Sequence, residues 1–95
     1  MKTIKDINFT KHPVSPTAVS GRLYFDNGWS ISVIGGDRFY GNGVTTFEVA
    51  IFKPNGEFYE SPNGEQVKPY VTKDEVTKIM LNVQRIKWRK LLKKL

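Results

Sequence analysis

The segment Gly21-Arg-Leu-Tyr-Phe-Asp-Asn-Gly-Trp-Ser-Ile-Ser-Val33 contains two alternating stretches of apolar and polar residues around a short turn. The wider stretches Thr17–Phe25 and Trp29–Ile34 have the composition of β-strands, and Asp26-Asn27-Gly28 between them is a strong turn signal. The sequence therefore predicts an antiparallel β-hairpin here, and the remaining elements are inferred outward from it.

The length of the hairpin loop determines which residues share a face. A two-residue loop places Tyr24 opposite Ile31, whereas a three-residue loop places Leu23 opposite Ile31. Only the second arrangement gathers the apolar side chains on one face of the hairpin. It also leaves Gly28 for the left-handed position that such loops need. The hairpin is therefore predicted with a three-residue loop.

A second hairpin is predicted after Thr45–Phe52, in which apolar and polar residues alternate with a period of two. The turn Lys53-Pro-Asn-Gly56 follows, and its proline is preset for the second turn position. Chain reversal there would pair Ile51 with Phe58. The segment Ile4–Thr10 is expected to add an edge strand, which His12-Pro13 would stop.

A C-terminal helix is expected once Ser61–Gly64 and Pro69 have ended the sheet. Thr72-Lys-Asp-Glu75 has the pattern of a capping box, and no proline or glycine follows before Leu95. The predicted fold class is α+β: a twisted antiparallel sheet of four to five strands with one long C-terminal helix packed on one face. Residues 1–95 are expected to form a single domain, with a sheet body at 1–70 and the helix at 71–95.

The apolar residues of this helix fall into two sets that face different directions. At ~100° per residue, the second set is rotated by more than about 90° from the first. Three interpretations therefore stay open: the helix kinks or ends near Lys87, its last turns pack on another part of the domain, or these turns face a partner. The first set is Val76, Ile79, Met80, Val83 and Ile86, and the second is Trp88, Leu91, Leu92 and Leu95.

Positive charge is concentrated at the C-terminus. The chain has a formal net charge of +6, and residues 1–84 contain nine basic and nine acidic side chains, so the whole excess lies in Arg85–Leu95. Basic residues interleaved with Trp88 suit nucleic-acid binding through phosphate contacts and stacking. Positive charges at the end of a helix also complement its dipole, so a purely structural interpretation stays open. The six basic residues are Arg85, Lys87, Arg89, Lys90, Lys93 and Lys94.

The glycine-rich loop Gly35–Gly43 lacks the spacing of a phosphate-binding loop, and no helix is expected to follow it. Its Arg38, Phe39 and Tyr40 are instead expected to be exposed contact residues, since aromatic side chains and arginine supply binding energy at interfaces.

Catalytic and metal chemistry is not expected. The chain has no cysteine, and its one histidine, His12, precedes a proline in a turn region. Glu57, Glu60 and Glu65 lie around turns, where solvated carboxylates are ordinary. No signal-peptide core and no run of ~18 apolar residues is present, so a cytoplasmic protein without a membrane span or a cofactor is expected.

Six short motifs occur along the chain in a characteristic order and spacing. They are His12-Pro13, Phe-x-Asn-Gly at Phe25–Gly28, Ile-Ser-Val at Ile31–Val33, Tyr40-Gly41, Phe-Glu-Val-Ala at Phe47–Ala50 and Tyr-Val-Thr-x-x-Glu-Val at Tyr70–Val76. With these motifs, about residues 4 to 83 resemble small, mostly uncharacterised proteins of tailed bacteriophages. The resemblance implies phage origin and a binding protein that acts in the cytoplasm of an infected bacterium. It does not extend beyond Ile86.

The sequence thus predicts a non-enzymatic interaction protein that binds a host protein or protein complex. Nucleic-acid binding by the basic C-terminal segment is the alternative, and a homodimer through the C-terminal helix is a further one. The residues expected to contact the partner are Arg38, Phe39, Tyr40, Arg85, Lys87, Trp88, Arg89, Lys90, Leu91, Lys94 and Leu95.

Overall fold

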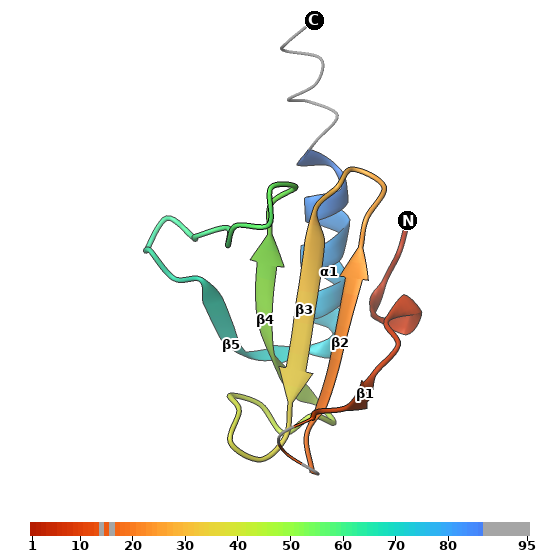
Figure 1. Ribbon diagram of the computed structural model, residues 1–95, viewed down its shortest axis with the longest axis vertical. Coiled ribbons are helices and arrows are strands. Elements are labelled where there is room, and N and C mark those ends of the chain that lie inside the picture. The colour runs from red at the N-terminus through yellow and green to blue at the C-terminus, as the bar shows by residue number, and fades with distance from the viewer. Residues whose placement is uncertain (14, 16, 87–95) are drawn as a thin grey trace, which may run out of the picture.

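Over the described residues, the protein is an antiparallel five-stranded sheet with one α-helix packed against one of its faces (Figure 1). The structure is a computed structural model that describes residues 1–13, 15 and 17–86. Each strand lies beside the next strand of the chain, and the sheet is open. The predicted α+β class is confirmed. In chain order the elements are η1 (Ile4–Asp6, a 3₁₀ turn), β1 (Thr10–Lys11), β2 (Val19–Tyr24), β3 (Ser30–Gly35), β4 (Thr46–Phe52), β5 (Val67–Thr72) and α1 (Lys73–Gln84).

The central hairpin of β2 and β3 has the predicted register. Leu23 pairs with Ile31, and the Phe25 N–H donates to the carbonyl of Trp29 at 2.8 Å, which closes a three-residue loop. Gly28 has a φ of 87°, the left-handed conformation that this loop requires. The register is confirmed because turn geometry and hydrophobic alternation favour the same pairing.

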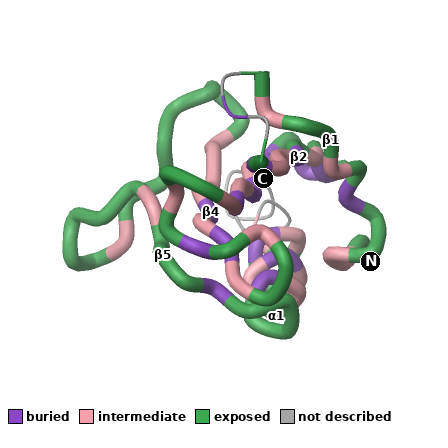
Figure 2. Tube along the Cα trace, turned by 90° about the horizontal axis from the view of Figure 1, so that it is seen from below, coloured by how far each residue is buried: buried purple, intermediate pink, exposed green. Residues whose placement is uncertain are grey.

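The core lies between α1 and the face of the sheet that carries alternate residues of β2, β3 and β4 (Figure 2). Val76, Met80 and Val83 of α1 are buried, and Ile79 and Ile86 are half-buried against the same cluster. The predicted apolar stripe of the helix is therefore confirmed. The sheet residues at the centre of the core are Ile31, Val33, Phe47, Val49 and Val71.

The second hairpin differs from the prediction by one residue. Phe52, not Ile51, pairs with Phe58, and the Lys53 N–H donates to the Glu57 carbonyl at 2.8 Å. The loop between them holds Gly56 at a φ of 88°, so it again has three residues with a left-handed glycine. A shift of one residue changes the face, so Phe52 and Phe58 meet on the side of the sheet away from α1.

The fifth strand lies where the sequence was expected to end the sheet. β5 contains Pro69 and pairs with β4 through Phe47 opposite Val71 and Thr46 opposite Thr72. A proline cannot donate a ladder hydrogen bond, but β5 is an edge strand, where the missing donor is tolerated. The expectation that Pro69 ends the sheet is therefore wrong.

The N-terminal segment is mostly not a strand. Ile4–Asp6 forms a 3₁₀ turn capped by Thr3, and within Ile4–Thr10 only Thr10 belongs to β1. The Ile4 N–H donates to the Thr77 hydroxyl at 3.2 Å, which holds this turn against α1. The predicted edge strand is wrong for Ile4–Phe9, because tertiary contacts with the helix replace sheet pairing there.

The helix begins as predicted. The Thr72 hydroxyl accepts the Glu75 N–H at 3.3 Å, and the Glu75 carboxylate accepts the Thr72 N–H at 3.1 Å. Within the described residues α1 ends at Gln84, with Arg85 as its C-cap. The predicted extension to Leu95 lies outside the described residues.

Candidate interaction surface

The β3–β4 loop contains backbone hydrogen bonds and close glycine contacts of its own. The Gly36 N–H donates to the Gly41 carbonyl at 3.0 Å, and the Phe39 N–H donates to the Gly36 carbonyl at 3.1 Å. A Cβ atom on Gly35 would lie 2.5 Å from the Cα of Gly43, so the two chain segments can approach only as glycines. Close backbone packing thus accounts for part of the glycine content of the loop.

Asn42 organises the second half of the loop. Its side-chain Oδ1 accepts the backbone N–H groups of Val44, Thr45 and Thr46 at 2.8, 2.8 and 3.1 Å. Its Nδ2 donates to the Thr45 hydroxyl at 2.9 Å. Backbone N–H groups that a loop would otherwise present to solvent therefore form hydrogen bonds within the loop, and these bonds order its second half.

The three residues predicted from this loop have different environments. Arg38 is exposed, and Tyr40 is 59% exposed. Phe39 is half-buried, with its ring centroid 4.9 Å from that of His12, so the expectation that it is exposed is wrong. His12 is likewise half-buried and contributes to the packing beneath the loop.

Tyr70 joins this surface although the sequence did not single it out. Its backbone N–H donates to the Tyr40 carbonyl at 3.3 Å, and the two rings lie 5.9 Å apart. Tyr70 is 63% exposed. Tyr40 and Tyr70 are distant in sequence, so only the pairing of β4 with β5 brings them together. We call Arg38, Phe39, Tyr40 and Tyr70 the loop surface.

Backbone strain is concentrated at the same place. Among the residues that the structure describes, the non-glycine residues with positive φ are Arg38, at 72°, and Tyr70, at 55°. Such conformations disfavour bulky side chains, and in proteins they cluster at functional sites. Both residues are exposed, and neither belongs to the core cluster. We therefore infer that their side chains act at the surface and not in core packing.

An acidic groove adjoins Tyr40. It has a volume of about 530 Å³ and is lined by three carboxylates, Glu48, Glu60 and Glu65, together with Val67 and Pro69. Partial burial raises the pKa of the Glu48 carboxyl. Because no lysine or arginine lines this groove, its walls suit a positively charged group of a partner.

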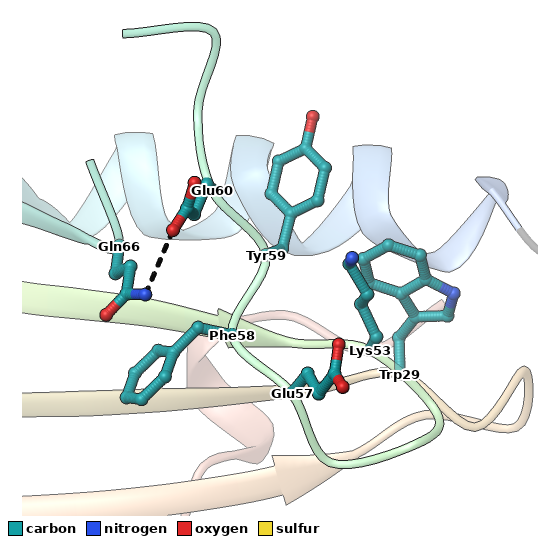
Figure 3. Close-up of a pocket in the computed structure, with 7 residues that line it drawn as sticks. All are labelled: Trp29, Lys53, Glu57, Phe58, Tyr59, Glu60 and Gln66. Carbon is teal, nitrogen blue, oxygen red and sulfur yellow. Dashed lines mark hydrogen bonds between the residues drawn. The ribbon is translucent and has the colours of Figure 1, made fainter. Parts of the chain in front are cut away.

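A second groove, of about 620 Å³, lies around residues 57–60 (Figure 3). Phe58 and Tyr59 project to opposite sides of this segment, and the ring of Tyr59 contacts that of Trp29 edge-on at 5.7 Å. The Gln66 amide donates to the Glu60 carboxylate at 3.1 Å. Glu57, Glu60 and Glu65 are all exposed, as expected of solvated carboxylates. Within the described part of the chain, no group of three histidine, cysteine or acidic residues is placed to hold a metal ion.

Of the predicted C-terminal contact residues, the structure places Arg85, which is exposed at the end of α1. The others, Lys87, Trp88, Arg89, Lys90, Leu91, Lys94 and Leu95, lie outside the described residues. Over residues 1–13, 15 and 17–86, no helix has the length and apolar character that crossing a membrane requires.

Comparison with protein-family models, with curated proteins and with solved structures finds no match to this chain. The resemblance to tailed-phage proteins therefore stays an expectation from the sequence. The arrangement that carries a functional interpretation is the loop surface, with its two exposed tyrosines beside an acidic groove.

Proposed function

We propose that this protein is a non-enzymatic interaction protein that binds a host protein through the loop surface. The observation that carries the proposal is the pairing of Tyr40 with Tyr70, both mostly exposed, on a backbone strained at Arg38 and Tyr70. Strained backbone and exposed aromatic rings both destabilise a fold, and their occurrence together is typical of a binding surface. Phage origin and action in the host cytoplasm follow from the sequence resemblance and form part of this proposal.

The chemistry of the loop surface favours a partner segment with a basic side chain. Two tyrosine rings provide apolar contact area at a small cost in conformational entropy, and their hydroxyl groups can bond to a partner. The neighbouring carboxylates of Glu48, Glu60 and Glu65 would pair with a lysine or arginine of that partner. The tyrosines would supply affinity, and the carboxylates would supply orientation.

The test is capture of bacterial proteins by the immobilised full chain, followed by measurement of the affinity for the captured protein. We expect Tyr40→Ala to weaken binding by about tenfold or more, because exposed aromatic residues at an interface centre commonly contribute at least ~1.4 kcal/mol. Tyr24→Ala is the matched control, since Tyr24 is 65% exposed at the far end of β2. Equal affinities of the wild-type and Tyr40→Ala proteins would refute the assignment of the loop surface.

The second candidate function is nucleic-acid binding through the basic segment Arg85–Leu95. The charge partition favours it, because the body of the chain is neutral and this segment carries the whole net charge of +6. Binding of this kind weakens steeply as salt rises, since phosphate contacts release counterions. It would be lost when Lys87, Arg89 and Lys90 are replaced together by glutamine, and it would be unaffected by Tyr40→Ala.

A further inference from the structure

One face of the sheet is not covered by any element among the described residues. α1 packs on the opposite face, as the views in Figure 1 and Figure 2 show. The strand register places three rows of side chains across the uncovered face, and two of them lie nearest the β2–β3 turn. The first row is Arg22, Ser32 and Ala50, and the second is Tyr24, Ser30 and Phe52.

A cation and three aromatic rings form a continuous stack on this face. The guanidinium carbon of Arg22 lies 3.9 Å from the ring centroid of Phe52 and 5.3 Å from that of Tyr24. The rings of Phe52 and Phe58 lie 4.6 Å apart. The Arg22 guanidinium also donates to the Ser30 hydroxyl at 3.2 Å, which fixes its position. We call Arg22, Tyr24, Phe52 and Phe58 the stacking platform.

The stacking platform contributes nothing to the core, which lies on the other side of the sheet. Tyr24 is 65% exposed and Phe58 is 41% exposed, so both rings can receive a further planar group. Aromatic faces and arginine planes of this kind stack on unpaired nucleobases, and a base in a duplex interior presents no free face to them.

A groove lined by hydrogen-bond donors continues from Arg22 toward β1. It has a volume of about 340 Å³, and no carboxylate lines it. Apart from His12, which packs against Phe39, its lining includes a guanidinium, an amide and three hydroxyl groups, which together suit a phosphate oxygen. The polar side chains are Asn8, Thr10, His12, Ser20, Arg22 and Ser32.

The nearest acidic side chain along the register is separated from this donor groove. In the row Ser20, Ile34 and Glu48, Ser20 and the apolar Ile34 line the donor groove, and Glu48, the next residue of the row, does not. Glu48 instead lines the acidic groove beside Tyr40. The uncovered face is therefore divided by charge, and an anionic ligand is directed to the β1–β2 side.

We propose that the uncovered face binds single-stranded nucleic acid. Two or three bases stack on the platform, and the adjoining phosphates occupy the donor groove. Arg22 belongs to both, so one residue couples base stacking to phosphate binding. This inference does not rest on the loop surface or on the basic segment Arg85–Leu95, which carries the whole net charge of +6.

The test is a fluorescence anisotropy titration of the full chain with a labelled oligothymidylate of about twelve nucleotides, at two salt concentrations. We expect Tyr24→Ala and Arg22→Gln each to weaken binding by about tenfold, the effect of losing one stacked base or one strong phosphate contact. A plot of log K against log salt concentration should become less steep in Arg22→Gln, with a slope smaller in magnitude by about 0.7. In Tyr24→Ala this slope should not change. Tyr40→Ala and Lys68→Gln are the matched controls, because they remove an exposed ring and an exposed charge near β5. Both should bind within about twofold of the wild type.

Three outcomes would overturn the proposal. The first is absence of binding at low salt, and the second is a duplex of the same length binding as tightly as the single strand. The third is wild-type affinity in both platform variants, with loss of binding only when Lys87, Arg89 and Lys90 are neutralised, which would assign binding to the C-terminal segment.

A second experiment applies if a variant fails to fold, as judged by its circular dichroism spectrum. The amide NMR shifts of the wild-type protein are then followed as the oligonucleotide is added. Shifts at Arg22 and Ser32 support the proposal, and shifts confined to the helix end contradict it.

Discussion

At the scale of the residue, Glu48 on the uncovered face links the burial of one carboxyl to the pH dependence of stability. Burial raises its pKa, so the folded state binds the proton more tightly than the unfolded state. The stability that this proton provides is present below the ordinary pKa of the carboxyl and is lost as pH rises through the raised pKa. Glu48→Gln, which cannot ionise, is therefore expected to raise Tm at neutral pH by a small amount and to leave it unchanged near about pH 3.

Thermal unfolding at the two pH values measures this effect. Glu65→Gln is the control, since Glu65 is exposed and lines the same groove. If Glu65→Gln gives the same gain, or if the gain of Glu48→Gln persists in acid, the cause is not burial of the Glu48 carboxyl.

At the scale of the element, the capping box at the start of α1 links sequence directly to stability. Hydrogen bonds from the Thr72 backbone and side chain lower the pKa of the Glu75 carboxyl. A lowered pKa stabilises the fold above the ordinary pKa of glutamate, and this stability is lost as pH falls through the folded value. Thr72→Ala is expected to cost about 1 kcal/mol in the free energy of unfolding at neutral pH.

Urea unfolding followed by circular dichroism tests the capping box. Lys73→Ala provides the control, because Lys73 lies in the same turn and is exposed but takes no part in the box. Glu75→Gln should be less stable than the wild type at neutral pH and should approach it in acid. A deficit of Glu75→Gln that does not depend on pH would contradict the role of its charge.

At the scale of the whole molecule, Asn27 ties the central hairpin to the far end of the helix. It is 4% exposed, and its Nδ2 donates to the Val83 carbonyl at 2.8 Å while its Oδ1 accepts the Trp29 N–H at 3.1 Å. Asn27→Ala removes both buried hydrogen bonds and is expected to cost about 1–3 kcal/mol. Because one side chain joins two remote elements, sheet and helix should lose stability together.

Circular dichroism during urea unfolding tests whether sheet and helix unfold together. The near-ultraviolet signal reports tertiary packing, and the far-ultraviolet signal reports the helix. Both transitions should move to lower urea by the same amount in Asn27→Ala. Asn55→Ala, in the exposed turn after β4, should shift them much less. Transitions that separate would mean that the hairpin and the helix do not unfold as one unit.

Much of the candidate site was within reach of the sequence. A glycine-rich loop between two strand patterns predicted that Arg38 and Tyr40 are exposed, and both are. Tyr70 was missed, because Pro69 before it suggested the end of the sheet, and no local pattern relates Tyr70 to Tyr40. The stacking platform was missed for a similar reason: the predicted pairing of Ile51 with Phe58 placed the phenylalanine on the wrong face.

The sequence by itself determined the features that depend on near neighbours along the chain. These are the register of the β2–β3 hairpin, the start of α1, the apolar stripe of the helix and the concentration of charge after Gln84. Loop length, capping and helical periodicity act over a few residues, so they can be read locally. The tertiary structure alone decided that β5 pairs at the edge beside β4, that Tyr70 meets Tyr40, and that Arg22 stacks on Phe52. Those contacts join segments remote in sequence, and they arise only when the strands assemble and one face of the sheet is left uncovered.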